Sequence, residues 1–198
     1  MLIKFDLLIR VTVPSVTRPG VVSVDIGSLD DYLTHGIKED KKAQEILNKY
    51  MKKYKVTNIT QKIDSKIHHR IKALKDFSNV HKGDYGGWIL DESNLSQEGD
   101  CWIEYDAVAT DTSYVGDNAR LMEESVARGT ATIRGNATVL GYAEIEGNAE
   151  IEGNAKVYGR VSGEALIGGD IIVEEGAEVS GKLVLAGTGT LTLGMTIK

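Results

Sequence analysis

The sequence predicts a mainly β fold, in which a small α/β domain precedes a left-handed parallel β-helix of hexapeptide repeats. Two observations predict the β-helix. From Ile103 onward the chain has a period of six residues, with an aliphatic residue first and a small residue fifth in most hexads. Residues 18 apart also match in type, as in Asn118, Asn136 and Asn154. Three hexads that close one triangular coil produce a period of 18, so these asparagines are expected to stack as a ladder.

Each hexad is expected to run as a short strand and then turn a corner. The aliphatic residue fills the interior, and Gly, Asn and Asp near the third and fourth positions accept the backbone angles of a corner. Stacked coils are separated by about 4.8 Å, the spacing of paired strands. The aliphatic first positions are Ile103, Ala109, Val115, Leu121, Ala127, Ile133, Val139, Ile145, Ile151 and Val157.

Charged residues on neighbouring coils are also in register. A separation of 18 places Arg128 beside Glu146 and Arg134 beside Glu152. Opposite charges on adjacent strands contribute roughly 0.2–1 kcal/mol per pair. The same period therefore aligns polar ladders as well as core columns.

The hexad frame breaks after Val157. Keeping the frame would place Gly163 and Gly169 in the interior, whereas restarting at Val161 restores an aliphatic residue at every sixth position up to Ile197. The sequence therefore predicts a shortened side near residues 158–163. Residues 103–198 are expected to form roughly five coils at 18 residues each.

Residues 79–102 are expected to cap the first coil, which has no neighbour below it. The large apolar residues Trp88 and Trp102 are the predicted core of this cap. A role of the two rings in stacking on a ligand is the alternative.

Residues 1–78 are predicted to form a small basic α/β domain. Alternation of apolar and polar residues predicts strands over 5–13, 21–26, 55–63 and 66–73. A capping box at Ser28 starts a short helix, and apolar residues at helical spacing up to Tyr54 predict a second one. The opposite face of this second helix is either solvated or a candidate binding site for a protein partner or phosphates. Its lysines are Lys41, Lys42, Lys49, Lys52 and Lys53.

Composition limits the classes of function. The 22 Gly against 2 Pro fit many regular turns, and Cys101, the one cysteine, excludes an internal disulfide. No apolar run is long enough to span a membrane, and a cytoplasmic protein is expected. Residues 1–80 hold 15 basic and 9 acidic residues, whereas residues 81–198 hold 8 and 20. This asymmetry favours two regions with different partners.

Segments 83–89 and 94–102, followed by runs of Gly-Asn-Ala, resemble hexapeptide-repeat proteins of bacteriophages and prophages. They are also distantly similar to the bacterial hexapeptide acyltransferase superfamily. The resemblance covers residues 66–198. It implies a solenoid that self-associates, with a homotrimer favoured, and an origin in a phage or prophage.

The residues that such acyltransferases need are not found in the repeats. The resemblance implies a histidine on the solenoid as general base, yet the four histidines are His35, His68, His69 and His81. Three zinc-binding histidines are likewise absent from the repeats. No catalytic residues, metal or cofactor are therefore predicted.

Three functions remain open from the sequence. The first is a non-enzymatic scaffold or binding protein, in which the solenoid oligomerises and the N-terminal domain engages a protein partner. The second is a phage counter-defence protein that inhibits a host immune protein or sequesters a nucleotide signal. The third is an acyltransferase or a degenerate relative of one. Binding of nucleic acid finds little support, because no aromatic residues alternate with the lysines.

Overall fold

The computed structural model describes residues 9–13, 20–24 and 52–198. The chain divides into two compact units, Met1–Met51 and Lys52–Lys198. In the first unit, β1 (Ile9–Val13) and β2 (Gly20–Val24) pair antiparallel, with Ile9 beside Val24. The predicted helix at Ser28, and the predicted second helix up to residue 51, lie outside the described residues. The predicted domain boundary at residue 78 differs from this division, because residues 52–78 belong to the second unit.

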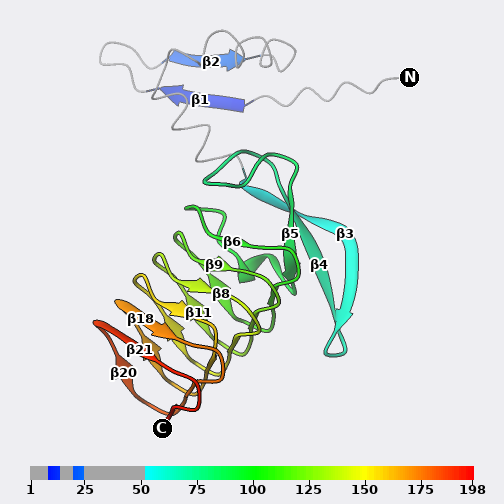
Figure 1. Ribbon diagram of the computed structural model, residues 1–198. Helices are drawn as coiled ribbons and strands as arrows, with labels where there is room; N and C mark the ends of the chain where they lie inside the picture. Colours follow the sequence, from blue (N-terminus) through cyan, green and yellow to red (C-terminus); the bar gives the residue numbers. More distant parts are fainter. Residues whose placement is uncertain (1–8, 14–19, 25–51) are drawn as a thin grey trace. The chain divides into compact units, whose positions relative to one another are not determined.

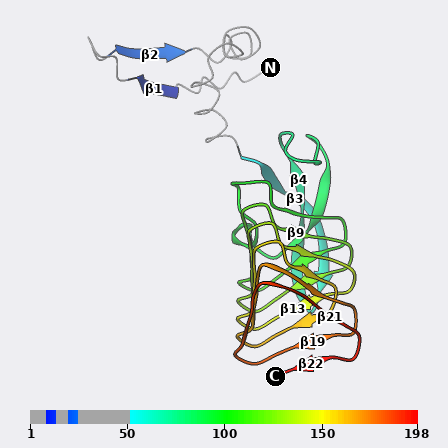
Figure 2. The ribbon, with the colours of Figure 1, turned by 60° about the vertical axis from the view of Figure 1, so that its left-hand side comes forward.

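The second unit is a parallel β-solenoid with a β-hairpin at one end of the stack of coils (Figures 1 and 2). The solenoid part of the first sheet, in stacking order, contains β5 (Tyr85–Ile89), β7 (Val108–Ala109), β10 (Val126–Ala127), β13 (Glu144–Ile145), β16 (Arg160–Val161), β19 (Glu178–Val179) and β22 (Thr196–Ile197). The second sheet contains β8 (Tyr114–Val115), β11 (Thr132–Ile133), β14 (Glu150–Ile151), β17 (Leu166–Ile167) and β20 (Val184–Leu185). The third contains β6 (Trp102–Ile103), β9 (Arg120–Leu121), β12 (Thr138–Val139), β15 (Lys156–Val157), β18 (Asp170–Val173) and β21 (Thr188–Leu191).

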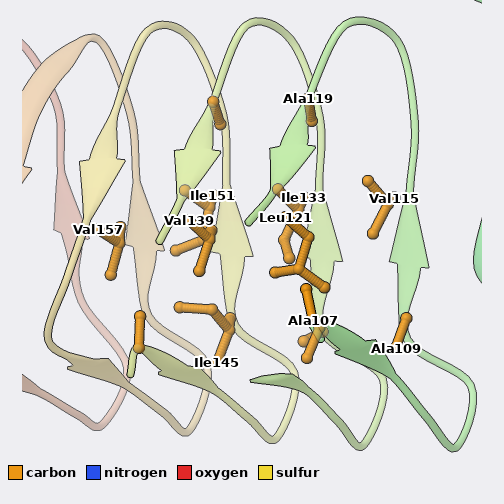
Figure 3. Packing of buried hydrophobic residues seen from close by; sticks show 14 of the residues in the cluster. Ala107, Ala109, Val115, Ala119, Leu121, Ile133, Val139, Ile145, Ile151 and Val157 are labelled. Atoms are coloured by element: carbon orange, nitrogen blue, oxygen red, sulfur yellow. The ribbon is translucent and has the colours of Figure 1, made fainter. Parts of the chain in front are cut away.

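The interior of the coils has the columns that the period of 18 predicts. Val115, Ile133 and Ile151 pair in register on one sheet and are fully buried. Figure 3 shows such aliphatic side chains pointing into the same space from different sheets. Ala119, Ala131 and the other small residues of the fifth position are also fully buried, because the corner leaves no room for a larger side chain.

The corners have a left-handed backbone at the third position of the hexads. In later coils this residue is glycine, as at Gly135 with a φ of 68°. In the second coil it is acidic, and each carboxylate accepts a hydrogen bond from the backbone N–H of the glycine one coil further on. Asp117 accepts from Gly135 at 3.0 Å in this way. Asp111 and Glu123 do the same at the other two corners.

The predicted break after Val157 is confirmed. Val161 lies beside Ile145, sixteen rather than eighteen residues away, and Val173 likewise lies beside Val157. The two missing residues fall between β15 and β16. Beyond this short side the spacing returns to 18, with Val179 beside Val161.

The first coil begins earlier than predicted. Ile89 pairs beside Ala109, Leu95 bridges to Val115, and Ile103 lies beside Leu121. Residues 85–103 therefore form a coil of their own, whereas the sequence predicts that residues 79–102 are the cap. For this reason the solenoid has about six coils, as the six strands of the third sheet show, rather than the predicted five.

A β-hairpin covers this first coil. Strands β3 (Tyr54–Ile63) and β4 (Lys66–Ala73) pair antiparallel, and β4 continues the first sheet by pairing with β5. Their two-residue turn, Asp64 and Ser65, has positive φ at both positions, as tight hairpins require. Trp102 packs edge-on against Tyr54 and Phe77, with ring centroids 6.2 and 5.4 Å apart. The hairpin thus closes one end of the hydrophobic core.

Among the described residues the only helix is η1 (Glu92–Asn94), a single 3-10 turn. No helix of this part of the chain is long and apolar enough to cross a membrane.

Candidate functional site

The lysines singled out in the sequence do not form one described surface. Lys41, Lys42 and Lys49 lie outside the described residues. Lys52 is exposed and pairs with Glu92 at 2.7 Å. Lys53 is 1% exposed. The prediction that Lys53 belongs to an exposed lysine face is therefore wrong, because strand β3 begins directly after Lys53, at Tyr54, where helical spacing was predicted.

Lys53 is instead the centre of a buried polar cluster in the first coil. Its Nζ donates to the backbone carbonyls of Glu98, Gly99 and Cys101 at 3.2, 3.2 and 2.9 Å, and lies 3.1 Å from the Cys101 Sγ. Burial lowers the pKa of Lys53 and raises the pKa of Cys101. Burial thus disfavours the thiolate of Cys101, which is the form that acts as a nucleophile.

The described histidines lie outside the hexapeptide repeats, with His68 and His69 on β4 and His81 in the segment before β5. His68 on β4 is fully buried, and neither ring nitrogen has a hydrogen-bond partner in the described part of the chain. Burial lowers its pKa, with smaller effects of Lys66, Asp64 and Asp111. A side chain without exposed surface is not placed to act on a substrate. His35 lies outside the described residues.

Several glutamates of the solenoid pair with arginines on neighbouring coils. Arg134 contacts Glu152 at 2.7 Å and Glu150 at 3.2 Å, as the spacing predicts for Glu152. The predicted pair of Arg128 with Glu146 is not formed, because Glu146 contacts Arg160 at 2.5 Å. Arg128 lies instead near Asp64 and Glu144, at 3.7 and 3.8 Å.

The three asparagines singled out in the sequence form a continuous ladder. Asn118 donates to Asn136, and Asn136 donates to Asn154, at 3.0 Å each. Asn154 donates in turn to Asp170 at 2.9 Å. This ladder is exposed, and it ties four coils together.

Arg70 on β4 is the centre of a surface that no pattern in the sequence predicts. Its guanidinium carbon lies 5.7 Å from the ring centroid of Tyr85, 5.4 Å from that of Trp88 and 5.7 Å from that of Tyr105. These rings belong to β5 and to the corner after β6, which the solenoid brings next to β4. Lys72 Nζ lies 4.6 Å from the Tyr85 ring. We refer to Arg70, Lys72, Tyr85, Trp88 and Tyr105 as the arginine–aromatic surface.

The two cations of this surface are not neutralised by the described chain. No carboxylate of residues 52–198 forms an ion pair with Arg70 or Lys72. The Nε of Arg70 donates to the carbonyl of Gly86 at 3.1 Å, which orients the guanidinium. Residues 52–82 carry nine Lys and Arg against two Asp. Residues 83–107, which supply the aromatic rings of the surface, carry seven Asp and Glu and no Lys or Arg. The positive charge of the surface is therefore that of Arg70 and Lys72 themselves, and these two cations favour acidic ligands.

Tyr105 occupies an unusual backbone position. It stands at the third position of its hexad, with a φ of 36°, where most later coils have glycine. A bulky residue in the left-handed region costs on the order of 1 kcal/mol or more. Its side chain is nevertheless 69% exposed. Burial therefore does not explain the tyrosine, whereas its place in the arginine–aromatic surface does.

Trp88 and Trp102, the predicted core of the cap, are both buried. Trp102 packs under the hairpin, and Trp88 lies under Arg70. Among the described residues, no group of three or more His, Cys, Asp or Glu is placed to hold a metal ion.

Comparison with known proteins gives one partial match. No protein-family model matches the chain. A segment of 61 residues, 30% of the chain, is 41% identical to a protein of Escherichia coli K12 named uncharacterized acetyltransferase YdcK. The match spans 19% of that protein's length. The solenoid and this match together fit a hexapeptide-repeat, acyltransferase-like protein.

Proposed function

We propose that the chain is a non-enzymatic binding protein, in which a self-associating solenoid serves as a rigid scaffold for a partner-binding surface on its first coil. The observation that carries the proposal is the arginine–aromatic surface. Arg, Trp and Tyr dominate the binding energy of protein interfaces. Arg70, Tyr85 and Trp88 are held on the paired strands β4 and β5, so little freedom of these side chains remains to be lost on binding. Arg70 and Lys72 form no ion pair with a carboxylate of residues 52–198, and these two cations favour an acidic partner.

Two tyrosines with equal exposure provide the test. Tyr105 and Tyr142 are each 69% exposed, and Tyr142 lies at a corner outside the arginine–aromatic surface. The chain would be immobilised and used to capture proteins from an extract of its source organism. The expected result is a partner that is retained by Tyr142→Ala and lost with Tyr105→Ala. Capture that is equal for both variants would contradict the proposal.

Self-association is the second part of the proposal. The flat outer faces of the parallel sheets suit side-by-side packing, and a homotrimer remains our expectation. Light scattering at micromolar concentration measures the mass directly. A monomeric mass would contradict the proposed self-association, but it would not contradict partner binding by the arginine–aromatic surface. The origin in a phage or prophage rests on the sequence resemblance alone.

An acyltransferase activity is the second candidate, and the 41% identity with a segment of an acetyltransferase favours it. Calorimetric titration with acetyl-CoA tests it. Micromolar binding, followed by release of free CoA thiol as the acetyl group passes to an added amine or hydroxyl acceptor, would establish the enzyme in place of the binding protein.

A further inference from the structure

We propose that the arginine–aromatic surface binds a phosphate ester that carries a planar ring, which is the chemistry of a mononucleotide. Arg70 and Lys72 would hold the phosphate, and the exposed ring of Tyr105 would stack on the base. This inference rests on the proposed binding function of the same surface and specifies its ligand.

The guanidinium of Arg70 is oriented to bind an oxyanion. Its Nε is held by the carbonyl of Gly86, and the rings of Tyr85, Trp88 and Tyr105 pack around its carbon at 5.4 to 5.7 Å. Among residues 52–198 its terminal nitrogens have no acceptor. Arginine presents these N–H groups as a planar fork that matches two oxygens of a phosphate. The aromatic rings displace water from the guanidinium and strengthen such a contact.

The charge of the site matches a phosphate better than a single carboxylate. Arg70 and Lys72 both lie against the Tyr85 ring, and the described chain supplies neither with a carboxylate. A carboxylate would neutralise one of them, whereas a phosphate monoester carries about −1.5 to −2 at neutral pH and neutralises both.

The neighbouring carboxylates are mostly engaged elsewhere. Asp84 accepts from the backbone N–H of His81 at 2.8 Å, and Glu104 pairs with Arg120 at 3.3 Å. Asp106, next to Tyr105, is exposed. Its charge opposes an anion, so Asp106→Asn is expected to tighten the binding of phosphate esters.

Tyr105 supplies the contact for the planar ring. Arg70 lies against its ring, and the 69% exposure leaves surface for a base. Stacking of a base on an aromatic side chain is largely independent of the base, so the site is expected to accept purines of different kinds. A role in stacking explains why tyrosine occupies this strained position. Glycine would adopt the backbone of the corner without strain, but it has no ring to stack on a base.

Calorimetric titration of the full chain with AMP, inorganic phosphate and adenosine separates the two contacts. AMP is expected to bind at least tenfold more tightly than either of the others, since only AMP carries both groups. Arg70→Lys is expected to weaken AMP binding by about tenfold or more, because lysine lacks the fork. Arg134→Lys, at an exposed arginine already paired with two glutamates, is the matched control and should leave binding unchanged.

Tyr105→Gly separates the ligand contact from a structural role. Glycine relieves the left-handed backbone, so the melting temperature should stay equal or rise while the affinity for AMP falls by about tenfold. No AMP binding at millimolar concentration, or equal affinities for AMP and inorganic phosphate, would overturn the proposal. If AMP fails but a captured protein depends on Tyr105, the binding function stands and its ligand is not a nucleotide.

Discussion

The repeating coils and the first coil of the solenoid are stabilised by different kinds of contact. In the repeating coils each rung is the template for the next, so aliphatic and small residues recur in columns and polar residues form ladders. The first coil has repeating neighbours on one side only. It has two extra residues between Leu95 and Ile103, because Leu95 bridges to a residue twenty positions on and Ile103 pairs with one eighteen positions on.

In the first coil, individual buried polar side chains take the place of the repeated contacts. Asn94 is fully buried, accepts from the backbone N–H groups of Leu90 and Asp91, and donates to the carbonyls of Asp111 and Ser113. Lys53 satisfies the carbonyls of the two-residue insertion in the same manner. The comparison shows that repetition supplies stability, whereas the non-repeating end combines buried polar groups with the binding surface.

The largest expected effect tests this role of Lys53. Lys53→Met leaves three backbone carbonyls of the first coil without their donor, and we expect a loss of about 3 kcal/mol in the free energy of unfolding. The neighbouring Lys52→Met removes an exposed ion pair and should cost less than about 1 kcal/mol. Chemical denaturation of both variants measures the difference. Equal losses would show that the buried cluster does not hold the first coil.

Two glycines of the repeating coils test how closely the rungs are stacked. Gly153 and Gly141 have nearly the same φ, 67° and 69°. A Cβ at Gly153 would lie 2.7 Å from the backbone nitrogen of Gly169, whereas at Gly141 the nearest atom is 3.8 Å away. We expect Gly153→Ala to lower the free energy of unfolding by about 1–3 kcal/mol more than Gly141→Ala does. Thermal melts that coincide would show that the corners tolerate a side chain.

The buried His68 makes the capped end sensitive to pH. Its pKa is lowered in the folded chain, chiefly by burial, so the unfolded chain binds the extra proton first. Its contribution to stability is therefore complete above the usual histidine pKa of about 6.5 and is lost as pH falls below that value. The melting temperature should drop between pH 7.5 and 5.5, and His68→Gln should reduce this drop. His81→Gln, at an exposed residue, is the control and should leave the drop unchanged.

The smallest expected effect concerns the asparagine ladder. Asn136→Ala removes one donated and one accepted side-chain hydrogen bond on the surface of the repeating coils. We expect a loss of about 1 kcal/mol, because each exposed bond replaces one to water. Asn148→Ala, at an equivalent corner position outside this ladder, is the comparison. If Asn136→Ala lowered the free energy of unfolding by more than Lys53→Met does, the expected order of the two effects would be wrong.

The regular part of the fold was predictable because its information is local and repeated. A hexad needs one aliphatic residue for the interior and one small residue for the corner, and ten hexads in succession leave no other period. The restart of the hexad frame at Val161 was also predictable from the sequence, because the original frame would have placed glycines in the core. Strands 55–63 and 66–73 were predicted within one residue of β3 and β4. The attachment of these two strands to the solenoid was not predicted, because no local sequence pattern encodes it.

The sequence by itself determined the period, and with it the columns, the ladder and the corners. The tertiary structure decided which residues meet at the non-repeating end. Helical spacing predicts that Lys53 is exposed, but it is buried because β3 begins one residue later and carries it into the first coil. Arg70, Trp88 and Tyr105 come from three separate segments. Only the pairing of β4 with β5 and the closure of the first coil bring them to one surface.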